Sequence, residues 1–227
     1  MIIVTGGAGF IGSALVWALN ERGEDDILIV DHLGTSEKWK NLRALRYADY
    51  MEKDDFLECL WDGFLHAQPS CILHMGACSA TTETDASYLV HNNFDYTKQV
   101  LEYAAGNDIR VVYASSAATY GDGSQGYRDD ETALDALRPL NMYGYSKQMA
   151  DQWALRNGHL KTAAAVKFSN VFGPNEQHKG DMRSMVSKAW KQIRAEGKVQ
   201  LFKSHRDEYA DGEQVGDFIY VRDAVAM

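Results

Sequence analysis

Short, continuously apolar runs along the chain alternate with longer segments in which apolar residues recur every three or four positions. The runs Ile2–Val4 and Ile27–Val30 are typical of strands buried on both faces of a parallel sheet. Between them, Phe10–Arg22 has apolar residues at helical spacing, and Gly23 follows as a residue that commonly ends helices. Strand, glycine-rich turn, helix and strand within about 30 residues predict a βαβ unit.

The same alternation continues beyond this unit. It predicts further strands at Ser70–His74, Arg110–Ala114 and Ala163–Phe168, and helices at Thr84–Ala105, Asn141–Arg156 and Asp181–Glu196. In the first of these helices we expect four core side chains, Tyr88, Leu89, Val100 and Leu101. Strands that alternate with helices predict an α/β fold, a Rossmann-like doubly wound parallel sheet. After Gly173-Pro174 the alternation loosens, and residues 205–214 are expected to form a polar, acidic loop.

Composition narrows the class of protein. With 227 residues, 45% of them hydrophobic, the chain can bury a sizeable core, and its net charge of −9 disfavours a general nucleic-acid-binding protein. Cys59, Cys71 and Cys78 are odd in number and lack CxxC spacing, so we expect free thiols and neither a disulfide nor a metal site. Because the chain has no basic leader and no run of about 18 apolar residues, we expect a cytoplasmic protein without a membrane span.

A glycine-rich turn between the first strand and the first helix predicts a phosphate site. Gly6, Gly9 and Gly12 allow a tight turn, close backbone approach to a pyrophosphate and close packing of the helix on the strand. The helix N-terminus then offers free N–H groups to the phosphates. Asp31, at the end of the second strand, predicts hydrogen bonds to the adenosine ribose and favours NAD, whereas Lys38 and Lys53 could neutralise the 2′-phosphate of NADP.

Three further residues predict the chemistry at the same edge of the sheet. Tyr143 and Lys147 are four residues apart and share one face of a predicted helix. A phenol with an ordinary pKa of about 10 must titrate roughly 3 units lower to act as a base near pH 7. A nearby ammonium and a positively charged nicotinamide both favour the phenolate. Ser116, at the end of the strand that begins at Arg110, could hydrogen-bond the same substrate oxygen.

Six blocks of sequence carry a resemblance to a known family: MIIVTGGAGFIGSALV, GACSATTETD, YASSAATYG, PLNMYGYSKQ, FSNVFGPNEQHKG and DFIYVRD. On these blocks the chain resembles the extended short-chain dehydrogenase/reductases, in the NAD-dependent epimerase/dehydratase family. The last four blocks are typical of sugar-nucleotide enzymes, and the HKG and GACS segments point to the heptose 6-epimerase branch of the family.

The resemblance implies roles for individual residues. Tyr143 and Lys179 would be two acid/base groups at opposite faces of the substrate, with Lys147 and Ser116 beside Tyr143. NADP, in preference to NAD, would be bound by Gly6, Gly9, Phe10, Ile11, Gly12, Asp31, His32, Lys38, Lys53, Met75, Gly76, Ala77, Cys78, Ser79, Asn92, Lys147 and Val171. The sugar nucleotide would contact Asn170, Asp181, Lys188, Phe202, Lys203, Ser204 and His205.

The activity that the resemblance implies is redox-neutral. ADP-D-glycero-D-manno-heptose would be epimerised at C6″ to the L-glycero form by transient hydride transfer to bound NADP, in the synthesis of a lipopolysaccharide core precursor. A 4,6-dehydratase is disfavoured because Ser116-Ala117-Ala118 stands where that enzyme usually has Thr-Asp-Glu. Two alternatives remain. One is a UDP-hexose 4-epimerase or another nucleotide-sugar epimerase. The other is a catalytically silent dinucleotide-binding fragment, since Gly216 replaces a usual arginine.

The resemblance also implies an organisation. Residues 1–170 would form the NADP-binding domain and residues 171–227 part of a substrate-binding region. Family members continue past the position of Met227, so we expect an N-terminal fragment with an exposed apolar patch. A homo-oligomer, a pentamer by resemblance, is expected, with a small nucleotide sugar as the partner molecule.

Overall fold

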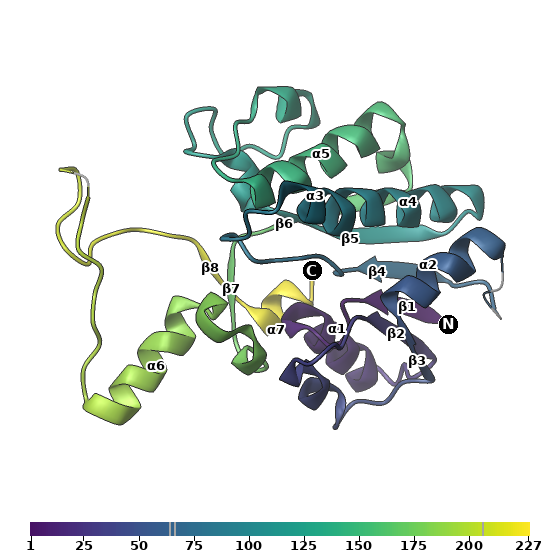
Figure 1. Ribbon diagram of the computed structural model, residues 1–227, viewed down its shortest axis with the longest axis horizontal. Coiled ribbons are helices and arrows are strands. Elements are labelled where there is room, and N and C mark those ends of the chain that lie inside the picture. The colour runs from purple at the N-terminus through teal and green to yellow at the C-terminus, as the bar shows by residue number, and fades with distance from the viewer. Residues whose placement is uncertain (64, 66, 206) are drawn as a thin grey trace.

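The computed structural model describes residues 1–63, 65, 67–205 and 207–227. Phe64, His66 and Arg206 lie outside this description. A six-stranded parallel sheet has the order β3-β2-β1-β4-β5-β6 (Figure 1). Its strands are β1 Ile2–Thr5, β2 Ile27–Asp31, β3 Asp49–Glu52, β4 Cys71–His74, β5 Arg110–Ser116 and β6 Ala163–Phe168. The strand order reverses between β1 and β4, which is the position where open α/β sheets bind their ligands. The predicted Rossmann-like fold is confirmed.

Helices connect the strands of this sheet. The α-helices are α1 Phe10–Glu21, α2 Lys53–Asp62, α3 Ala86–Leu89, α4 Tyr96–Gly106, α5 Met142–Arg156, α6 Met185–Glu196 and α7 Val221–Ala224. A π-helical segment, Val90–Asp95, joins α3 to α4. Short 3-10 helices lie at Glu37–Leu42, Ala117–Tyr120, Glu131–Ala136, His159–Lys161 and Gln177–Met182. Two short strands outside the main sheet, β7 Asn170–Phe172 and β8 Phe218–Tyr220, pair in parallel.

Alternation along the strands divides the core into two layers. Ile3, Leu28 and Val30 pack against α2 and α4 on one face, and Val4, Ile27 and Ile29 belong to the cluster under α1 on the other. All six side chains are at most 3% exposed. Fully burying a side chain of this size contributes about 1.5–3 kcal/mol, so the continuous apolar runs of β1 and β2 are the main hydrophobic anchor of the sheet.

Only part of the segment after residue 170 packs against the rest of the protein. Phe10 and Ala14 of α1 pack against Val171, Val221 and Ala224 in a separate apolar cluster. By contrast, α6 contains no buried residue, and the chain from its end to β8 runs out as an extended arm (Figure 1). Two large apolar side chains in this part of the chain are exposed, Trp190 at 62% and Phe202 at 60%.

Three local expectations differ from the structure. The helix predicted at Thr84–Ala105 is interrupted by the π-helical segment, and Tyr88, expected in the core, is 46% exposed. The helix predicted from Asp181 begins at Met185, after a 3-10 helix. Strand β3 and helix α2 were not predicted. The other predicted strands and helices are confirmed, and the three cysteines are free thiols.

Within the part of the chain that the structure describes, no helix combines the length and apolar character that a membrane crossing requires. Nor do the described residues gather three or more His, Cys, Asp or Glu side chains into a group that could hold a metal ion.

Candidate functional site

Parallel pairing brings the predicted site residues to one edge of the sheet. Thr5 at the end of β1 pairs with Val30 of β2 and with His74, the last residue of β4. Strand β5 continues beyond Tyr113, the partner of His74, to Ser116. The glycine turn, Asp31, the turn after His74 and Ser116 therefore follow four neighbouring strands at their carboxyl ends.

The glycine turn has no room for side chains. An ideal Cβ on Gly12 would lie 2.0 Å from the Gly6 carbonyl oxygen, and one on Gly6 would lie 2.8 Å from the Gly76 nitrogen. Gly6 also has a φ of +66°, which favours glycine. No side chain caps the N-terminus of α1, so the first-turn N–H groups of Phe10 and Ile11 are not used by a capping residue. This backbone cradle fits a pyrophosphate at a helix N-terminus.

The Asp31 carboxylate, at the end of β2, contacts the backbone of the glycine turn. It accepts hydrogen bonds from the Ala8 N–H at 2.8 Å and the His32 N–H at 2.7 Å. The Lys38 ammonium lies 2.6 Å from the same carboxylate. Lys53 instead donates to Asn92 Oδ1 at 2.9 Å and lies 3.3 Å from an Asp54 oxygen. Lys38 therefore lies at the predicted ribose site, whereas Lys53 contacts Asn92.

The turn Met75–Ser79 is held by a buried asparagine that the sequence analysis missed. Asn93, in the π-helical segment, accepts from the Cys78 N–H at 2.7 Å and donates to the Cys78 carbonyl at 3.0 Å. Its amide also lies 2.9 Å from the Ser146 hydroxyl of α5. π-Helical turns occur frequently at functional sites. The only sequence signal was a pair of asparagines within an otherwise helical, partly apolar pattern.

Below this turn, His74 is a core residue rather than a ligand. Its ring nitrogens lie 2.7 Å from the Thr5 hydroxyl and 3.0 Å from the Thr97 hydroxyl. Burial, with a smaller contribution from the Lys147 charge, lowers the pKa of His74 to about 3. The imidazole is therefore neutral at physiological pH.

Tyr143, Lys147 and Ser116 come together as predicted. The Asn141 side chain caps α5 by accepting from the Gly144 N–H at 2.7 Å, which places Tyr143 in the first helical turn. The Ser116 hydroxyl lies close enough to the Tyr143 phenol to lower its pKa. Lys147 is 4% exposed and donates to the Ala114 carbonyl at 2.8 Å.

Burial controls the pKa values of Tyr143 and Lys147 in the protein without a coenzyme. Burial raises the pKa of the Tyr143 phenol, and the Ser116 hydroxyl only partly opposes this. Burial also lowers the pKa of Lys147 to about 8, against the opposing effects of Asp151 and Cys78. The predicted lowering of the Tyr143 pKa depends on the charge of the bound coenzyme as well as on Lys147, and in the protein alone desolvation of the phenol is the larger effect.

Lys179 lies at the glycine turn. Its Nζ is 5.4 Å from the centroid of the Phe10 ring, and burial lowers its pKa. Asn41 links the turn that carries Lys179 to the glycine turn. Its Nδ2 donates to the Ala8 carbonyl at 2.9 Å and lies 3.3 Å from His178 Nδ1. Among the described residues, no hydrogen bond or ion pair joins Lys179 to Tyr143.

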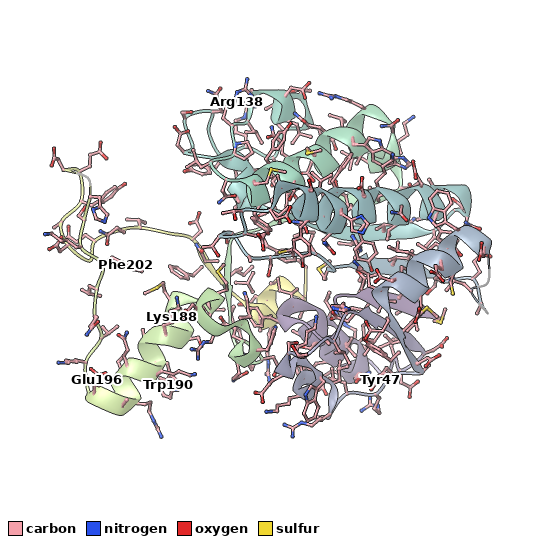
Figure 2. The ribbon with its side chains drawn as sticks, viewed as in Figure 1. Tyr47, Arg138, Lys188, Trp190, Glu196 and Phe202 are labelled. Carbon is pink, nitrogen blue, oxygen red and sulfur yellow. The ribbon has the colours of Figure 1, made fainter. Side chains whose placement is uncertain are left out.

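The predicted sugar-nucleotide residues are not brought together. The Asn170 amide donates to the Asp217 carbonyl at 2.9 Å, Asp181 is exposed, and Lys188 projects from α6 (Figure 2). Figure 2 places Phe202 on the extended arm, away from the sheet, with Lys203, Ser204 and His205 following it. Their roles stay predictions. Val171, predicted to touch the coenzyme, packs against Phe10.

The fold and the site together define a class of protein, a Rossmann-fold enzyme that uses a nicotinamide dinucleotide. Residues 2–227 match the family described as the NAD dependent epimerase/dehydratase family, and the chain belongs to that family. The resemblance noted in the sequence is thereby confirmed.

Individual relatives and solved structures show which proteins of known name the chain is similar to. The chain is 56% identical over 227 residues to the ADP-L-glycero-D-manno-heptose-6-epimerase of Nitratidesulfovibrio vulgaris, covering all of this chain and 70% of the relative. It is similar to the crystal structure of the Helicobacter pylori ADP-L-glycero-D-manno-heptose-6-epimerase, with a TM-score of 0.81, 27% identity, and coverage of 99% and 69% of the two chains. MoeE5 in complex with UDP-glucose and NAD has a TM-score of 0.70 at 28% identity, with coverage of 99% and 69%.

Proposed function

We propose that this protein epimerises ADP-D-glycero-D-manno-heptose at C6″ to the L-glycero form, a step toward a lipopolysaccharide core precursor. The observation that carries the proposal is the 56% identity, over the whole chain, to a relative of that name. The convergence of Ser116, Tyr143 and Lys147 at the coenzyme edge of the sheet supplies the chemistry that such a reaction needs.

The nicotinamide, when bound, supplies a reversible acceptor for the hydride of the C6″ carbon. The Tyr143 phenolate takes the proton of the C6″ hydroxyl while Ser116 orients that oxygen, so a ketone forms. Reduction of the ketone from its opposite face, with a proton returned to the oxygen, would complete the inversion with no net oxidation. Because burial holds the phenol protonated in the protein alone, its ionisation depends on positive charge nearby, from Lys147 and the oxidised coenzyme.

A second acid/base group suits a ketone that must be reduced from its other face. Lys179 is the proposed group: it is half-buried and its pKa is lowered, which makes proton exchange near neutral pH easier than for a solvated lysine. Its place over Phe10 is on the glycine-turn side of the site. We further propose that Asn170, Asp181, Lys188 and residues 202–205 contact the sugar nucleotide, and that the protein self-associates.

We propose NADP as the coenzyme. The 2′-phosphate would lie beside Asp31, where an unaccompanied carboxylate would repel it, and Lys38 offsets that charge from 2.6 Å. A Lys38→Ala variant is therefore expected to lose at least tenfold in affinity for NADP⁺ and to change little for NAD⁺, as measured by isothermal titration calorimetry. Equal losses for the two coenzymes would assign Lys38 to the Asp31 contact alone.

Product analysis tests the reaction. The purified chain is incubated with ADP-D-glycero-D-manno-heptose and catalytic NADP⁺, and the two C6″ epimers are resolved chromatographically. The L-glycero epimer is expected from the wild-type protein and from Tyr145→Phe, a matched control whose side chain is exposed on the same helix. Tyr143→Phe should abolish turnover and leave coenzyme binding nearly unchanged. Conversion of UDP-glucose to UDP-galactose, with the heptose untouched, would replace this proposal with a hexose 4-epimerase.

A further inference from the structure

An ion pair between a buried aspartate and a half-buried lysine lies near the end of the strand that carries Ser116, outside the coenzyme site. Asp151 is on α5, one helical turn after Lys147, and is 2% exposed. Its partner Lys167 is on β6, and the Lys167 Nζ lies 3.2 Å from Asp151 Oδ2. Neither residue belongs to the predicted coenzyme or substrate contacts.

The Asp151 carboxylate joins three elements. Its Oδ1 accepts a hydrogen bond from the Tyr113 hydroxyl at 3.0 Å, and its Oδ2 accepts one from the Ser115 hydroxyl at 2.6 Å. Tyr113 and Ser115 are on β5, and Ser115 directly precedes Ser116. One carboxylate therefore fixes the distance between α5, which bears Tyr143 and Lys147, and the end of β5.

Lys167 extends this connection to the turn after β5. Its ammonium donates to the Thr119 hydroxyl at 2.6 Å and lies 5.0 Å from the centroid of the Tyr120 ring. The Thr119 hydroxyl in turn donates to the Ser116 carbonyl at 2.8 Å, and the Ser116 hydroxyl accepts from the Ala118 N–H at 3.1 Å. A continuous chain of polar contacts thus runs from Asp151 through Lys167 and Thr119 to the backbone carbonyl of Ser116.

A buried ion pair is weak support for stability as such, because apolar residues of the same volume often serve equally well. What an apolar pair could not supply here is the set of directed contacts to Ser115 and Thr119. The carboxylate also counters the desolvation of Lys147. The other groups that face Lys147 are His74 on β4, Cys78 on the next turn and the Ala114 carbonyl on β5. His74 is neutral, so Asp151 is the carboxylate among the groups that act on this lysine.

We propose that Asp151, together with Lys167, is a positioning residue that sets the end of β5, with Ser116, against Tyr143 and Lys147 of α5. The inference rests on the proposed epimerase activity for its kinetic consequence, but its electrostatic consequence can be measured without turnover.

The experiment compares three variants with the wild-type protein. Asp151→Asn removes the charge and keeps an acceptor. Asp151→Asn/Lys167→Met removes both charges of the pair, so it restores charge balance in the interior. Asp135→Asn is the matched control, because Asp135 is exposed and its contacts are with Gln152, Arg138 and Arg156 on the solvent side.

Five quantities are measured for each protein: kcat and KM for the heptose substrate, Kd for NADP⁺, the melting temperature, and the pKa of Lys147 by NMR of ¹⁵N-labelled lysine. Asp151→Asn should lower kcat by about 100-fold, the usual size of a misplacement effect, and change Kd less than threefold. It should also lower the pKa of Lys147. The double variant should regain the melting temperature of the wild type and still show the low kcat and the lowered pKa.

The outcomes separate the inference from the proposed function. Recovery of wild-type kcat in the double variant would overturn the inference, because the pair would then serve stability alone. An unchanged pKa of Lys147 in Asp151→Asn would overturn it as well. If the wild-type protein does not convert the heptose substrate, the proposed function fails, and the NMR titration still decides whether Asp151 controls the Lys147 charge.

Discussion

Replacing Gly12 by alanine would put a methyl group inside the turn that we expect to hold the coenzyme pyrophosphate. An ideal Cβ at this position lies 2.0 Å from the Gly6 carbonyl oxygen and 2.8 Å from the Gly7 Cα. Ordinary contact begins near 3.4 Å, so α1 and the turn must separate by about 1.4 Å. Both neighbours are backbone atoms, and no side-chain rotation can relieve the overlap.

Overpacking of this kind costs about 1–3 kcal/mol, and a backbone-to-backbone clash should fall in the upper half of that range. Separation of the helix from the turn moves the first-turn N–H groups away from the phosphates. If about 2–3 kcal/mol is lost from coenzyme binding, the Kd for NADP⁺ rises roughly 30- to 150-fold.

Calorimetric titration with NADP⁺ measures this change, with the melting temperature recorded in parallel. Gly106→Ala is the control, because a Cβ there meets no atom within 4 Å. It should bind the coenzyme like the wild type and be neutral or slightly more stable. Binding of NADP⁺ by Gly12→Ala within twofold of the wild type would refute the placement of the pyrophosphate at this turn.

Three further predictions concern stability and the coupling of the site. Because the pKa of His74 is lowered from 6.5 to about 3, the unfolded chain binds an extra proton between these pH values, so the free energy of unfolding falls as the pH drops. His74→Gln should flatten this slope by up to about 1.4 kcal/mol per pH unit in urea titrations at pH 4–7. Glu176→Gln should cost about 1–3 kcal/mol in urea unfolding at pH 7, since this buried carboxylate accepts from the Gly173 and Ser184 N–H groups. Asn41→Ala should lower kcat about fivefold, with an unchanged melting temperature, by releasing the turn that bears Lys179 from the Ala8 carbonyl.

The strands that could be predicted were the ones that carry a short apolar run, and these include β6 at the opposite edge of the sheet from β3. Ile2–Val4 and Ile27–Val30 are continuously apolar because helices cover both sides of β1 and β2. Strand β3 lies at the edge of the sheet and consists of Asp49-Tyr50-Met51-Glu52, with no fully buried residue, so no apolar run marks it. Helix α2 was missed for a similar reason, because only Phe56 and Leu60 are buried along it.

The error at Tyr88 has a geometric cause. An α-helix turns by about 100° per residue, and a π-helical turn adds one residue. The π-helical segment Val90–Asp95 therefore shifts the phase of all earlier positions relative to Val100 and Leu101. Leu89 remains in the core at 0% exposed, whereas Tyr88 points outward. Periodicity measured over Thr84–Ala105 as one helix could not register this shift.

The residues of the candidate site also fall into two groups, those that the sequence could predict and those that it could not. The glycine turn, Asp31 and the Tyr143/Lys147 spacing are local patterns, and the order of residues along the chain is enough to assign a chemistry to each. Asn93, Asp151 and Lys167 act on the site through partners between 15 and 48 positions away, and no spacing along the chain marks those partners.

By itself, the sequence determined the parallel α/β class, the turn that can accept a pyrophosphate and the two residues of the Tyr–Lys pair. These follow from periodicity and from short motifs, in which the interacting groups are neighbours along the chain. Only the tertiary structure decided the charge states, the contacts that set Ser116 beside Tyr143, and the position of Lys179 over Phe10. Burial and partners distant in sequence control those properties, and both arise only when the sheet, its helices and its turns have packed together.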